Sequence, residues 1–274
     1  MFALACDRAY LYAHPERELT PDERTRYEEA IRQRSHGVPA QYITGHQEFW
    51  GMDLIVSPAV LIPRPETEHV IETVLQLASE SQSRAETTGL HRPLRIVDVG
   101  TGSGCIALAF ARELPSAEIH ASDISPDALE IARANAARHQ LESRIQFHEA
   151  DLLQGFESAV FDFVVSNPPY VGESEEDQVQ LEVRKFEPRR AVFAGPTGLE
   201  VIERLIPQAH AALKPGGWLV MEISGTIAAG VKPLLNGWNH VRITNDLQGI
   251  PRVAAAQKTD NKPGRNGLLG PGSY

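Results

Sequence analysis

A tetrapeptide in the second half of the chain, Asn167-Pro168-Pro169-Tyr170, has the residue types needed to hold a planar nitrogen. An amide or aromatic amino nitrogen has a delocalised lone pair, so it attacks an electrophile only when that pair is presented in line. The side-chain oxygen of Asn167 and the carbonyl of Pro168 can accept its two N–H groups and stabilise the developing positive charge. Prolines preorganise these acceptors, and Tyr170 can lie against the planar group. We therefore predict a catalytic and substrate-binding loop, although the tetrapeptide alone would also suit a proline-stiffened turn.

A glycine-rich stretch earlier in the chain, Asp98-Val99-Gly100-Thr101-Gly102-Ser103-Gly104, is the second candidate site. Glycine lets the backbone turn sharply and approach a ligand closely. Such a turn could be purely structural or could bind a nicotinamide nucleotide, but the spacing here is G-x-G-x-G, not G-x-G-x-x-G, and an acidic residue precedes it. No lysine follows the glycines, which excludes a P-loop. We expect this stretch to hold a cofactor through Gly100, Thr101, Gly102, Ser103 and Gly104.

Two carboxylates follow the next expected strands. Asp123 lies roughly 20 residues past the glycines, where an acid can accept hydrogen bonds from both hydroxyls of a ribose. It could instead cap a helix, but Ser125 and Pro126 already supply a cap and a first-turn proline. Asp151 could accept a hydrogen bond from an adenine amino group, although acids after strands are often only solvated. An adenosyl cofactor beside a loop for planar nitrogens indicates methyl transfer from S-adenosylmethionine.

Both candidate sites lie in a region where expected strands and helices alternate, from Pro93 onward. Apolar runs predict strands at 94–99, 118–122, 144–148, 161–166, 218–223, 240–244 and 252–258. Helices are expected at 66–79, 105–114, 126–138 and 199–213, and a polar loop at 79–92. This α/β alternation predicts a Rossmann-like class I methyltransferase fold, with a mostly parallel twisted sheet and helices on both faces. Ligands bind at the carboxyl ends of strands in such sheets, so both loops should face one crevice.

The segment before this alternating region has a different pattern. The stretch Thr20-Pro21-Asp22-Glu23 predicts a helix start, with an N-cap, a first-turn proline and first-turn acids, and Gly37 should end that helix. Phe49 and Trp50 beside Gly51 indicate a small β-hairpin in which both aromatic residues belong to the core. The chain then divides into a small helical domain at 1–45, a hairpin linker at 46–62, a methyltransferase domain at 63–260 and a flexible tail at 261–274.

The composition limits the partners of the chain. Its 274 residues carry a formal net charge of −10, whereas proteins that grip nucleic acid usually have a basic face. Two cysteines, Cys6 and Cys105, offer no disulfide framework, the N-terminus has no secretory pattern, and no apolar run reaches the length of a membrane span, so we expect a cytoplasmic protein. The histidines show no metal-like spacing. We expect a monomer without metal, membrane or direct nucleic-acid contact, and an acidic run from Glu173 to Glu182 that is a solvated loop or a lid.

Several stretches of the chain occur together: residues 37–45 (GVPAQYITG) leading to Phe49 and Gly51, residues 61–68 (LIPRPETE), the glycine stretch, residues 166–170 (SNPPY) and residues 186–188 (FEP). Together they resemble the HemK-type peptide chain release factor glutamine N5-methyltransferases, from about Leu11 to Lys258. The first two motifs separate this family from other N-P-P-Y enzymes. The resemblance implies that Gly100 to Gly104 and Asp123 hold S-adenosylmethionine. It also implies that Asn167 to Tyr170 hold the glutamine of the Gly-Gly-Gln motif in class I release factors, with Asn167 also at the cofactor, near the transferred methyl group.

The sequence departs from the family pattern in two places. Members usually begin with a longer helical domain, and we expect its first helices to be missing here, so either the start of the sequence is misassigned or the docking surface for a release factor is reduced. Some relatives carry an aromatic residue in the adenine pocket where this chain has Leu152.

Two other hypotheses stay open at this point. An amino methyltransferase acting on adenine or cytosine in RNA or DNA is the main alternative, because those amines are also planar. Such an enzyme would have to flip a base and hold a nucleic-acid backbone, which the acidic balance of the chain disfavours. A cofactor-binding scaffold without catalysis is the third hypothesis, and the intact N-P-P-Y loop argues against it.

Overall fold

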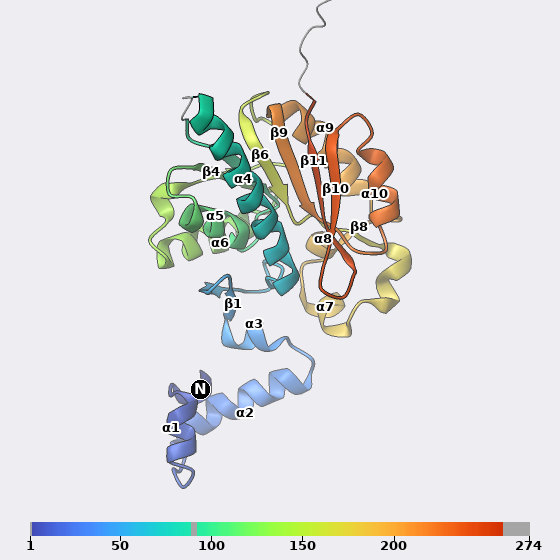
Figure 1. Cartoon of the computed structure of the whole chain (residues 1–274). Helices are drawn as coiled ribbons and strands as arrows, with labels where there is room; N and C mark the ends of the chain where they lie inside the picture. The colour runs from blue at the N-terminus through green and yellow to red at the C-terminus, as the bar shows by residue number, and fades with distance from the viewer. Residues whose placement is uncertain (1, 89–91, 260–274) are drawn as a thin grey trace, which may run out of the picture.

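Apolar runs in the second part of the chain form the strands of one twisted sheet (Figure 1). The computed structural model describes residues 2–88 and 92–259. The strands of the sheet are β3 (Arg95–Val99), β4 (Glu118–Asp123), β5 (Ile145–Glu149), β6 (Phe161–Ser166), β9 (Leu213–Glu222), β10 (Asn239–Asn245) and β11 (Pro251–Gln257). Their order is β10-β11-β9-β6-β3-β4-β5. Only the pairs β9–β11 and β10–β11 are antiparallel in the described part of this sheet, which confirms the predicted, mostly parallel sheet.

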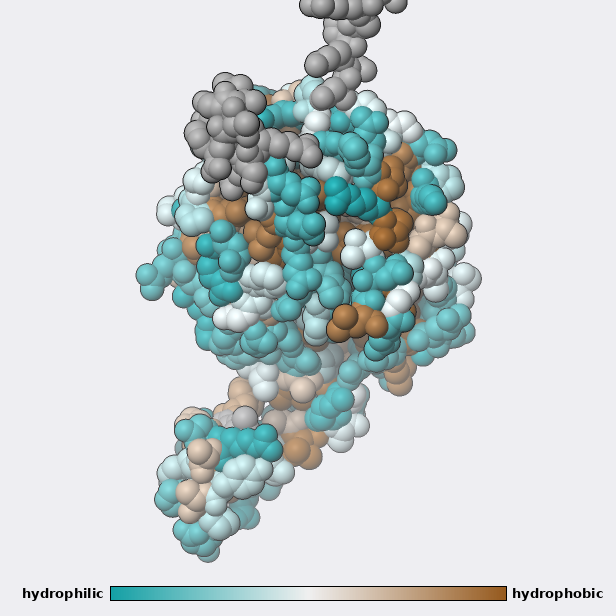
Figure 2. All heavy atoms as spheres, viewed as in Figure 1, coloured by the Kyte–Doolittle hydropathy of each residue, from teal (hydrophilic) through white to brown (hydrophobic). Residues whose placement is uncertain are grey.

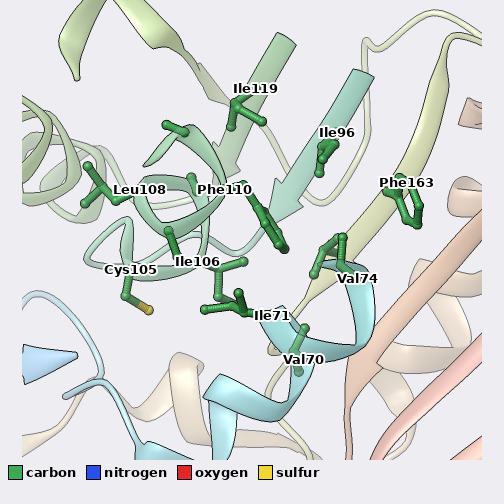
Figure 3. Packing of buried hydrophobic residues seen from close by; sticks show 14 of the residues in the cluster. Val70, Ile71, Val74, Ile96, Cys105, Ile106, Leu108, Phe110, Ile119 and Phe163 are labelled. Atoms are coloured by element: carbon green, nitrogen blue, oxygen red, sulfur yellow. The ribbon is translucent and has the colours of Figure 1, made fainter. Parts of the chain in front are cut away.

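One face of the sheet is covered by α4 (Glu68–Thr88), α5 (Cys105–Glu113) and α6 (Pro126–Arg138). Ile96, Ile119 and Phe163, from three different strands, point to this face. Figure 3 shows them gathered around Phe110 of α5 and Val74 of α4, and all of these side chains are buried. Burial of each such side chain contributes about 1.5–3 kcal/mol. The helix that follows the glycine stretch is therefore held firmly on the sheet.

The opposite face is covered by α9 (Glu200–Ala212) and α10 (Ala228–Leu234). Val97 and Val164 point to this face, whereas their chain neighbours Ile96 and Phe163 point to the other one. Successive residues of a strand alternate between faces. Because both faces are covered by helices, the central strands are apolar at nearly every position, as in other parallel sheets.

The N-terminal helices stand apart from the sheet as a separate lobe (Figures 1 and 2). They are η1 (Phe2–Leu4), α1 (Arg8–Ala13), α2 (Pro21–Ser35) and α3 (Ala40–Thr44). The predicted start of α2 is confirmed, because Thr20 Oγ1 accepts a hydrogen bond from the Glu23 amide (3.3 Å) and the Glu23 carboxylate accepts one from the Thr20 amide (2.9 Å). Tyr27 and Ile31 on this helix are about half exposed. The lobe therefore keeps apolar surface that the rest of the chain does not cover.

The predicted hairpin connects the lobe to the sheet, and consists of β1 (His46–Phe49) and β2 (Met52–Ile55). Phe49 is buried in the core, as expected, while Trp50 is only partly buried against it. Asn135 of α6, which is fully buried, accepts a hydrogen bond from the Ile55 amide (2.6 Å). Its amide nitrogen donates to the carbonyls of Ile55 (3.0 Å) and Ser103 (2.9 Å). One side chain thus fastens the hairpin to both α6 and the glycine stretch.

One loop prediction is wrong, and a second segment has more regular structure than a loop. Helix α4 continues to Thr88, so most of the loop expected at 79–92 is helical. The sequence there is polar but contains neither glycine nor proline before Gly89, so nothing in it breaks a helix. The acidic run also has regular structure, in η4 (Glu173–Gln178) and α7 (Leu181–Phe186). Some of its carboxylates pair with arginines, including Glu176 with Arg189 at 2.7 Å and Asp177 with Arg184 at 3.0 Å.

The remaining elements are short. They are η2 (Pro65–Thr67), η3 (Glu142–Arg144), β7 (Val171–Gly172), α8 (Arg189–Val192) and β8 (Phe193–Gly195). In the part of the chain that the structure describes, no helix is both long and apolar enough to cross a membrane. The tail expected at 261–274 lies outside the described residues.

Candidate active site

The glycine loop (residues 100–104) and the N-P-P-Y loop (residues 167–170) start from neighbouring strand ends. Val99, the last residue of β3, is the register partner of Ser166, the last residue of β6. Ser166 Oγ donates a hydrogen bond to the Val99 carbonyl at 2.7 Å. The strand order also reverses at β3, and ligands of open α/β sheets bind at such a switch point. The structure therefore brings Gly100 and Asn167 to one edge of the sheet, as the sequence predicts.

The outer side of the glycine loop is bare backbone. Gly100 and Gly102 have φ angles of 71° and 55°, a region that side chains disfavour. A Cβ atom at either position would meet no atom within 4 Å, so both residues face open space. The amides of Gly100 and Thr101 donate to the Ser122 carbonyl at 2.8 and 2.9 Å, which fixes the loop against β4. A ligand can therefore approach this backbone closely.

The inner side of the loop is held by buried groups. Asp98 is fully buried, and one of its carboxylate oxygens accepts hydrogen bonds from Thr101 Oγ1 (2.6 Å) and from a backbone amide of α5 (3.2 Å). Burial raises the pKa of Asp98 to about 7, although these hydrogen bonds oppose the shift. Ser103 is also buried, and a Cβ atom on Gly104 would lie 3.2 Å from the Cβ atom of Ala132. The side chains of Thr101 and Ser103 thus build the loop from within, and Gly104 allows α5 to pack on α6.

Asp123 ties the glycine loop to the start of α6. Its carboxylate accepts hydrogen bonds from the amides of Gly102 and Ser125, both at 2.9 Å. Ser125 is the N-cap of α6, as predicted, since its hydroxyl oxygen accepts from the Ala128 amide. Burial raises the pKa of Asp123, and the backbone hydrogen bonds lower it. The carboxylate is partly exposed and lies at the open edge of the loop.

A cavity of about 400 Å³ lies beside Asp123, beyond the carboxyl ends of β4 and β5. It is lined by Ile124, Glu149, Ala150, Asp151, Gln154 and Gly155. Ile124 is half exposed and gives the cavity an apolar wall. Asp151 forms an ion pair with Arg204 of α9. Leu152 does not line the cavity, because it packs against the core and its carbonyl accepts a hydrogen bond from Ser122 Oγ.

The side chains of the N-P-P-Y loop are held by two residues from distant parts of the chain. Asn167 Nδ2 donates a hydrogen bond to Thr67 Oγ1 at 3.0 Å, and Thr67 Oγ1 donates one to Glu222 Oε2 at 2.6 Å. Tyr170 Oη donates to the other oxygen of Glu222, Oε1, at 3.0 Å. Thr67 and Glu222 are each 1% exposed. We call this set, Asn167, Thr67, Glu222 and Tyr170, the hydrogen-bond relay.

Two further contacts fix segments that bear on the loop. The buried Glu187 carboxylate accepts a hydrogen bond from the Ile62 amide (3.1 Å) and forms an ion pair with Arg64, which fixes the chain that leads into η2 and Thr67. Gly198, with a φ of 84°, lies directly against the loop: a Cβ atom there would come within 2.5 Å of the Tyr170 carbonyl oxygen. Gly198 thus supports the loop directly, whereas Glu187 fixes the segment that carries Thr67.

The sequence motifs contained the signals for some of these residues but not their roles. Thr67, Arg64 and Ile62 belong to the LIPRPETE stretch, and Glu187 belongs to the FEP stretch. Glu222 is an acid within an otherwise apolar strand, and such an acid is unusual where both faces of a sheet are covered. The position of an acid at the end of an apolar strand could therefore have marked Glu222 as a candidate in the sequence.

The residues at the cofactor side fit S-adenosylmethionine. The bare backbone of the glycine loop admits a close approach, Asp123 offers acceptors for a ribose diol, and the adjacent cavity has both an apolar wall and an acidic group. Within residues 2–88 and 92–259, no group of three or more His, Cys, Asp and Glu side chains is arranged to hold a metal ion.

Comparison with known proteins identifies the family. Residues 84–185 match the model of the Methyltransferase small domain, and residues 1–45 match that of the PrmC N-terminal domain. A release factor glutamine methyltransferase from Koribacter versatilis is 56% identical over 94% of this chain and 88% of its own length. This chain belongs to the release factor glutamine methyltransferase family. A second member, from Rhodopirellula baltica, is 38% identical over 93% of this chain and 86% of its own.

Membership of this family confirms the resemblance noted in the sequence, the methyltransferase activity and the use of S-adenosylmethionine. Solved structures support the fold. The hMettl16 catalytic domain in complex with MAT2A 3'UTR hairpin 1 aligns with a TM-score of 0.61 over 94% of this chain and 93% of that chain, at 17% identity. The 16S rRNA N2 G1207 methyltransferase of Thermus thermophilus, in complex with AdoMet and guanosine, aligns with a TM-score of 0.54 over 78% of this chain and 49% of its own, at 20% identity. The class I methyltransferase fold predicted from the sequence is therefore confirmed.

Proposed function

We propose that this release factor glutamine methyltransferase transfers a methyl group to the side-chain amide nitrogen of the glutamine in the Gly-Gly-Gln motif of class I peptide chain release factors. The observation that carries the proposal is the orientation of the Asn167 amide. Its nitrogen is engaged by Thr67 (3.0 Å), so its oxygen is left to accept an N–H group from a substrate. Close relatives named as release factor glutamine methyltransferases support glutamine as that substrate.

The N-P-P-Y loop acts by orienting the substrate nitrogen. Asn167 Oδ1 and the Pro168 carbonyl accept its two N–H groups, which turns the lone pair toward the methyl donor. These acceptors also face the positive charge that develops on the nitrogen. Pro169 stiffens the loop, and the Tyr170 ring, held through its hydroxyl by Glu222, lies against the planar amide. S-adenosylmethionine supplies an electrophilic methyl group on a positively charged sulfur.

No side chain in this loop has to act as a strong base. The nitrogen becomes very acidic once it is methylated and loses its proton late. Glu222, the buried carboxylate nearest the loop, already accepts hydrogen bonds on both oxygens, from Thr67 and Tyr170. Its position indicates a role in orienting side chains, not in removing the proton.

For the cofactor side, we assign distinct contacts to the predicted residues. The backbone of Gly100 to Gly104 supports the methionine part of S-adenosylmethionine, and Asp123 accepts hydrogen bonds from the ribose. The cavity beside it takes the adenine, with Ile124 along one side and Asp151 as an acceptor for the amino group. The ion pair with Arg204 holds the Asp151 side chain at this cavity.

The remaining parts of the proposal concern partners. We assign the docking of the release factor to the N-terminal domain at 1–45, supported by its separate position and by the exposed Tyr27 and Ile31. We also propose a monomer in the cytoplasm, where translation takes place, without direct contact to nucleic acid, since the net charge is −10. Size-exclusion chromatography with light scattering tests the oligomeric state.

One labelling experiment tests the substrate. The protein is incubated with S-adenosylmethionine labelled in the methyl group and with a class I release factor, the same factor with the motif glutamine replaced by glutamate, RNA, or DNA. We expect label only on the unaltered release factor. Label on RNA or DNA alone would establish the alternative, an adenine or cytosine amino methyltransferase, and overturn this proposal.

A further inference from the structure

The hydrogen-bond relay lies under the N-P-P-Y loop and joins three segments that are far apart in sequence. Thr67 comes from η2, Glu222 from the end of β9, and Asn167 and Tyr170 from the loop itself. Neither Thr67 nor Glu222 is exposed enough to touch a substrate. Any effect they have on the reaction must therefore pass through Asn167 and Tyr170.

We propose that Glu222 and Thr67 are positioning residues that decide which end of the Asn167 amide faces the substrate nitrogen. This inference rests on the role proposed above for the N-P-P-Y loop and adds two residues to it. The amide group of asparagine is nearly symmetric in shape, so packing alone does not distinguish its oxygen from its nitrogen. The choice has to be made by hydrogen bonding.

The donors and acceptors of the relay allow one arrangement. An ionised carboxylate only accepts hydrogen bonds, so the Thr67 hydroxyl gives its single hydrogen to Glu222 Oε2 (2.6 Å). The Thr67 oxygen can then only accept, and the group it faces at 3.0 Å must be the Asn167 nitrogen. If the amide were turned round, two oxygens would meet with no hydrogen between them. Asn167 Oδ1 is thereby directed away from Thr67, as an acceptor for the substrate.

The environment of Glu222 indicates that this carboxylate is retained for a purpose other than stability. It is 1% exposed, and no arginine, lysine or histidine nitrogen of the described residues lies within ion-pair distance of it. Burial raises the pKa of Glu222; the hydrogen bonds from Thr67 and Tyr170 and the charge of Arg252 lower it, and the charge of Glu66 raises it. A buried charge without an ionic partner is unfavourable. Strained or costly groups of this kind gather at functional sites.

Replacing Glu222 by glutamine reverses the relay. In the Glu222→Gln variant the side-chain oxygen can keep the Tyr170 hydroxyl, while the new NH₂ group donates to Thr67. The Thr67 hydrogen is then free to point at Asn167, which draws the amide oxygen inward and turns its nitrogen toward the substrate. The N–H groups of Asn167 and of the substrate amide would then face each other, and no hydrogen bond could form between them. We expect kcat to fall about 100-fold or more, by analogy with the loss of one stabilising group in a transition-state site.

Thr67 variants separate this mechanism from a structural role. Thr67→Val keeps the shape but leaves the Asn167 amide without a fixed orientation, so we expect a smaller loss of kcat, roughly tenfold. Thr67→Ser keeps the hydroxyl and should stay within about threefold of the unaltered protein. Thr73→Val is the matched control, because the Thr73 hydroxyl bonds only to a backbone carbonyl of its own helix α4, and it should leave kcat unchanged.

Three measurements are made on each variant: kcat and KM for release factor labelling, affinity for S-adenosylmethionine by calorimetry, and the midpoint of thermal unfolding. Positioning predicts losses in kcat with cofactor affinity and melting temperature nearly unchanged. A merely structural role predicts the opposite order of the kcat values: Thr67→Val would lose at least as much kcat as Glu222→Gln. The melting temperature would fall together with kcat in both variants. That result would overturn the inference.

The outcomes also separate this inference from the proposed function. If the unaltered protein does not label a release factor, the proposed substrate is wrong. If it does, and Glu222→Gln stays within threefold of it, the positioning role alone is wrong. Neutron diffraction of the Glu222→Gln variant gives a readout that does not depend on activity, because it locates the hydrogens of Asn167. The amide nitrogen should have moved away from Thr67, and an unmoved nitrogen contradicts the inference.

Discussion

The two halves of the active site are built in different ways. The cofactor half is local, because the glycine loop, its inner acid Asp98 and Asp123, to which we assign the ribose, lie within one β-α-β segment and are joined mainly through backbone amides. The substrate half is assembled over long distances, since Asn167 is held by Thr67, 100 residues earlier, and Thr67 by Glu222, 155 residues later. A substitution in the first half should weaken the binding of the cofactor. Disturbing the second should slow the chemistry.

The largest expected effect is at Asn167. Asn167→Ala removes the acceptor that orients the substrate nitrogen, and we expect kcat to fall about 10³-fold. Cofactor affinity, measured by calorimetry, should largely survive because the glycine loop is not changed. Normal turnover in this variant would refute the role of the loop, and a parallel loss of cofactor binding would erase the distinction between the halves.

The next effect is expected at Gly198, which supports the N-P-P-Y loop from another segment. Gly198→Ala places a Cβ atom 2.5 Å from the Tyr170 carbonyl and puts alanine at a φ of 84°. The positive φ alone costs about 1–2 kcal/mol, and the clash should displace the loop and lower kcat roughly 100-fold. The measurements are thermal unfolding and labelling rate.

Gly237→Ala is the control for this backbone effect. It has a φ of 89° but would meet nothing within 4 Å. It should therefore lose a similar amount of stability to the positive φ and keep its kcat. If both variants lose activity equally, strain and not the contact with Tyr170 is responsible.

A smaller effect, on binding alone, is expected at Asp123. Asp123→Asn removes the charge that accepts hydrogen bonds from a ribose diol. We expect the Kd for S-adenosylmethionine to rise about 10- to 100-fold, because a hydrogen bond to a charged group contributes about 1.5–3 kcal/mol. At saturating cofactor, kcat should be close to that of the unaltered protein. Asp127→Asn, on the exposed first turn of α6, is the matched control. A loss in kcat instead of Kd would contradict the assignment.

The smallest effect is expected in the pH dependence of kcat. Burial raises the pKa of Glu222 above its usual value of 4.5. The charged or titratable groups near this carboxylate are Tyr170, Glu66, Arg252 and Cys105. Protonation turns the carboxylate into a donor and disturbs the relay. The rate should therefore be full above this raised pKa and fall as the pH drops through it. Labelling rates from pH 5 to pH 8 test this limb, which should be absent in Glu222→Gln.

The same contrast explains how much could be predicted from the sequence. The candidate cofactor half could be located from the sequence because its residues follow one another along the chain: an acid, a glycine loop and a second acid after the next strand. The side-chain directions within the loop were not predictable, since Thr101 turns inward to bond to Asp98 and Ser103 is buried, and both depend on the packing of the fold.

In the substrate half, the sequence revealed the loop but not what holds it. Glu222 meets Thr67 only after β9 has taken its place beside β6, and no periodicity in the chain encodes that pairing. The helix from 79 to 88 was missed for the opposite reason, because its polar composition was taken as a loop although nothing in it stops a helix. Local chemistry can be predicted from local sequence, whereas contacts between distant segments require the fold.

The pair of acceptors at Asn167 and Pro168 also sets when the reaction ends. An unmodified glutamine amide carries two N–H groups and can satisfy both acceptors, but a methylated one keeps a single N–H. On the proposed function, one of these two acceptors then loses its partner, and a buried acceptor without a partner is unfavourable by about 1–3 kcal/mol. The product is thus bound less tightly than the substrate and is a poor candidate for a second methyl group. If Asn167 and Pro168 act as proposed, the geometry that selects the nitrogen therefore also favours a single modification per glutamine.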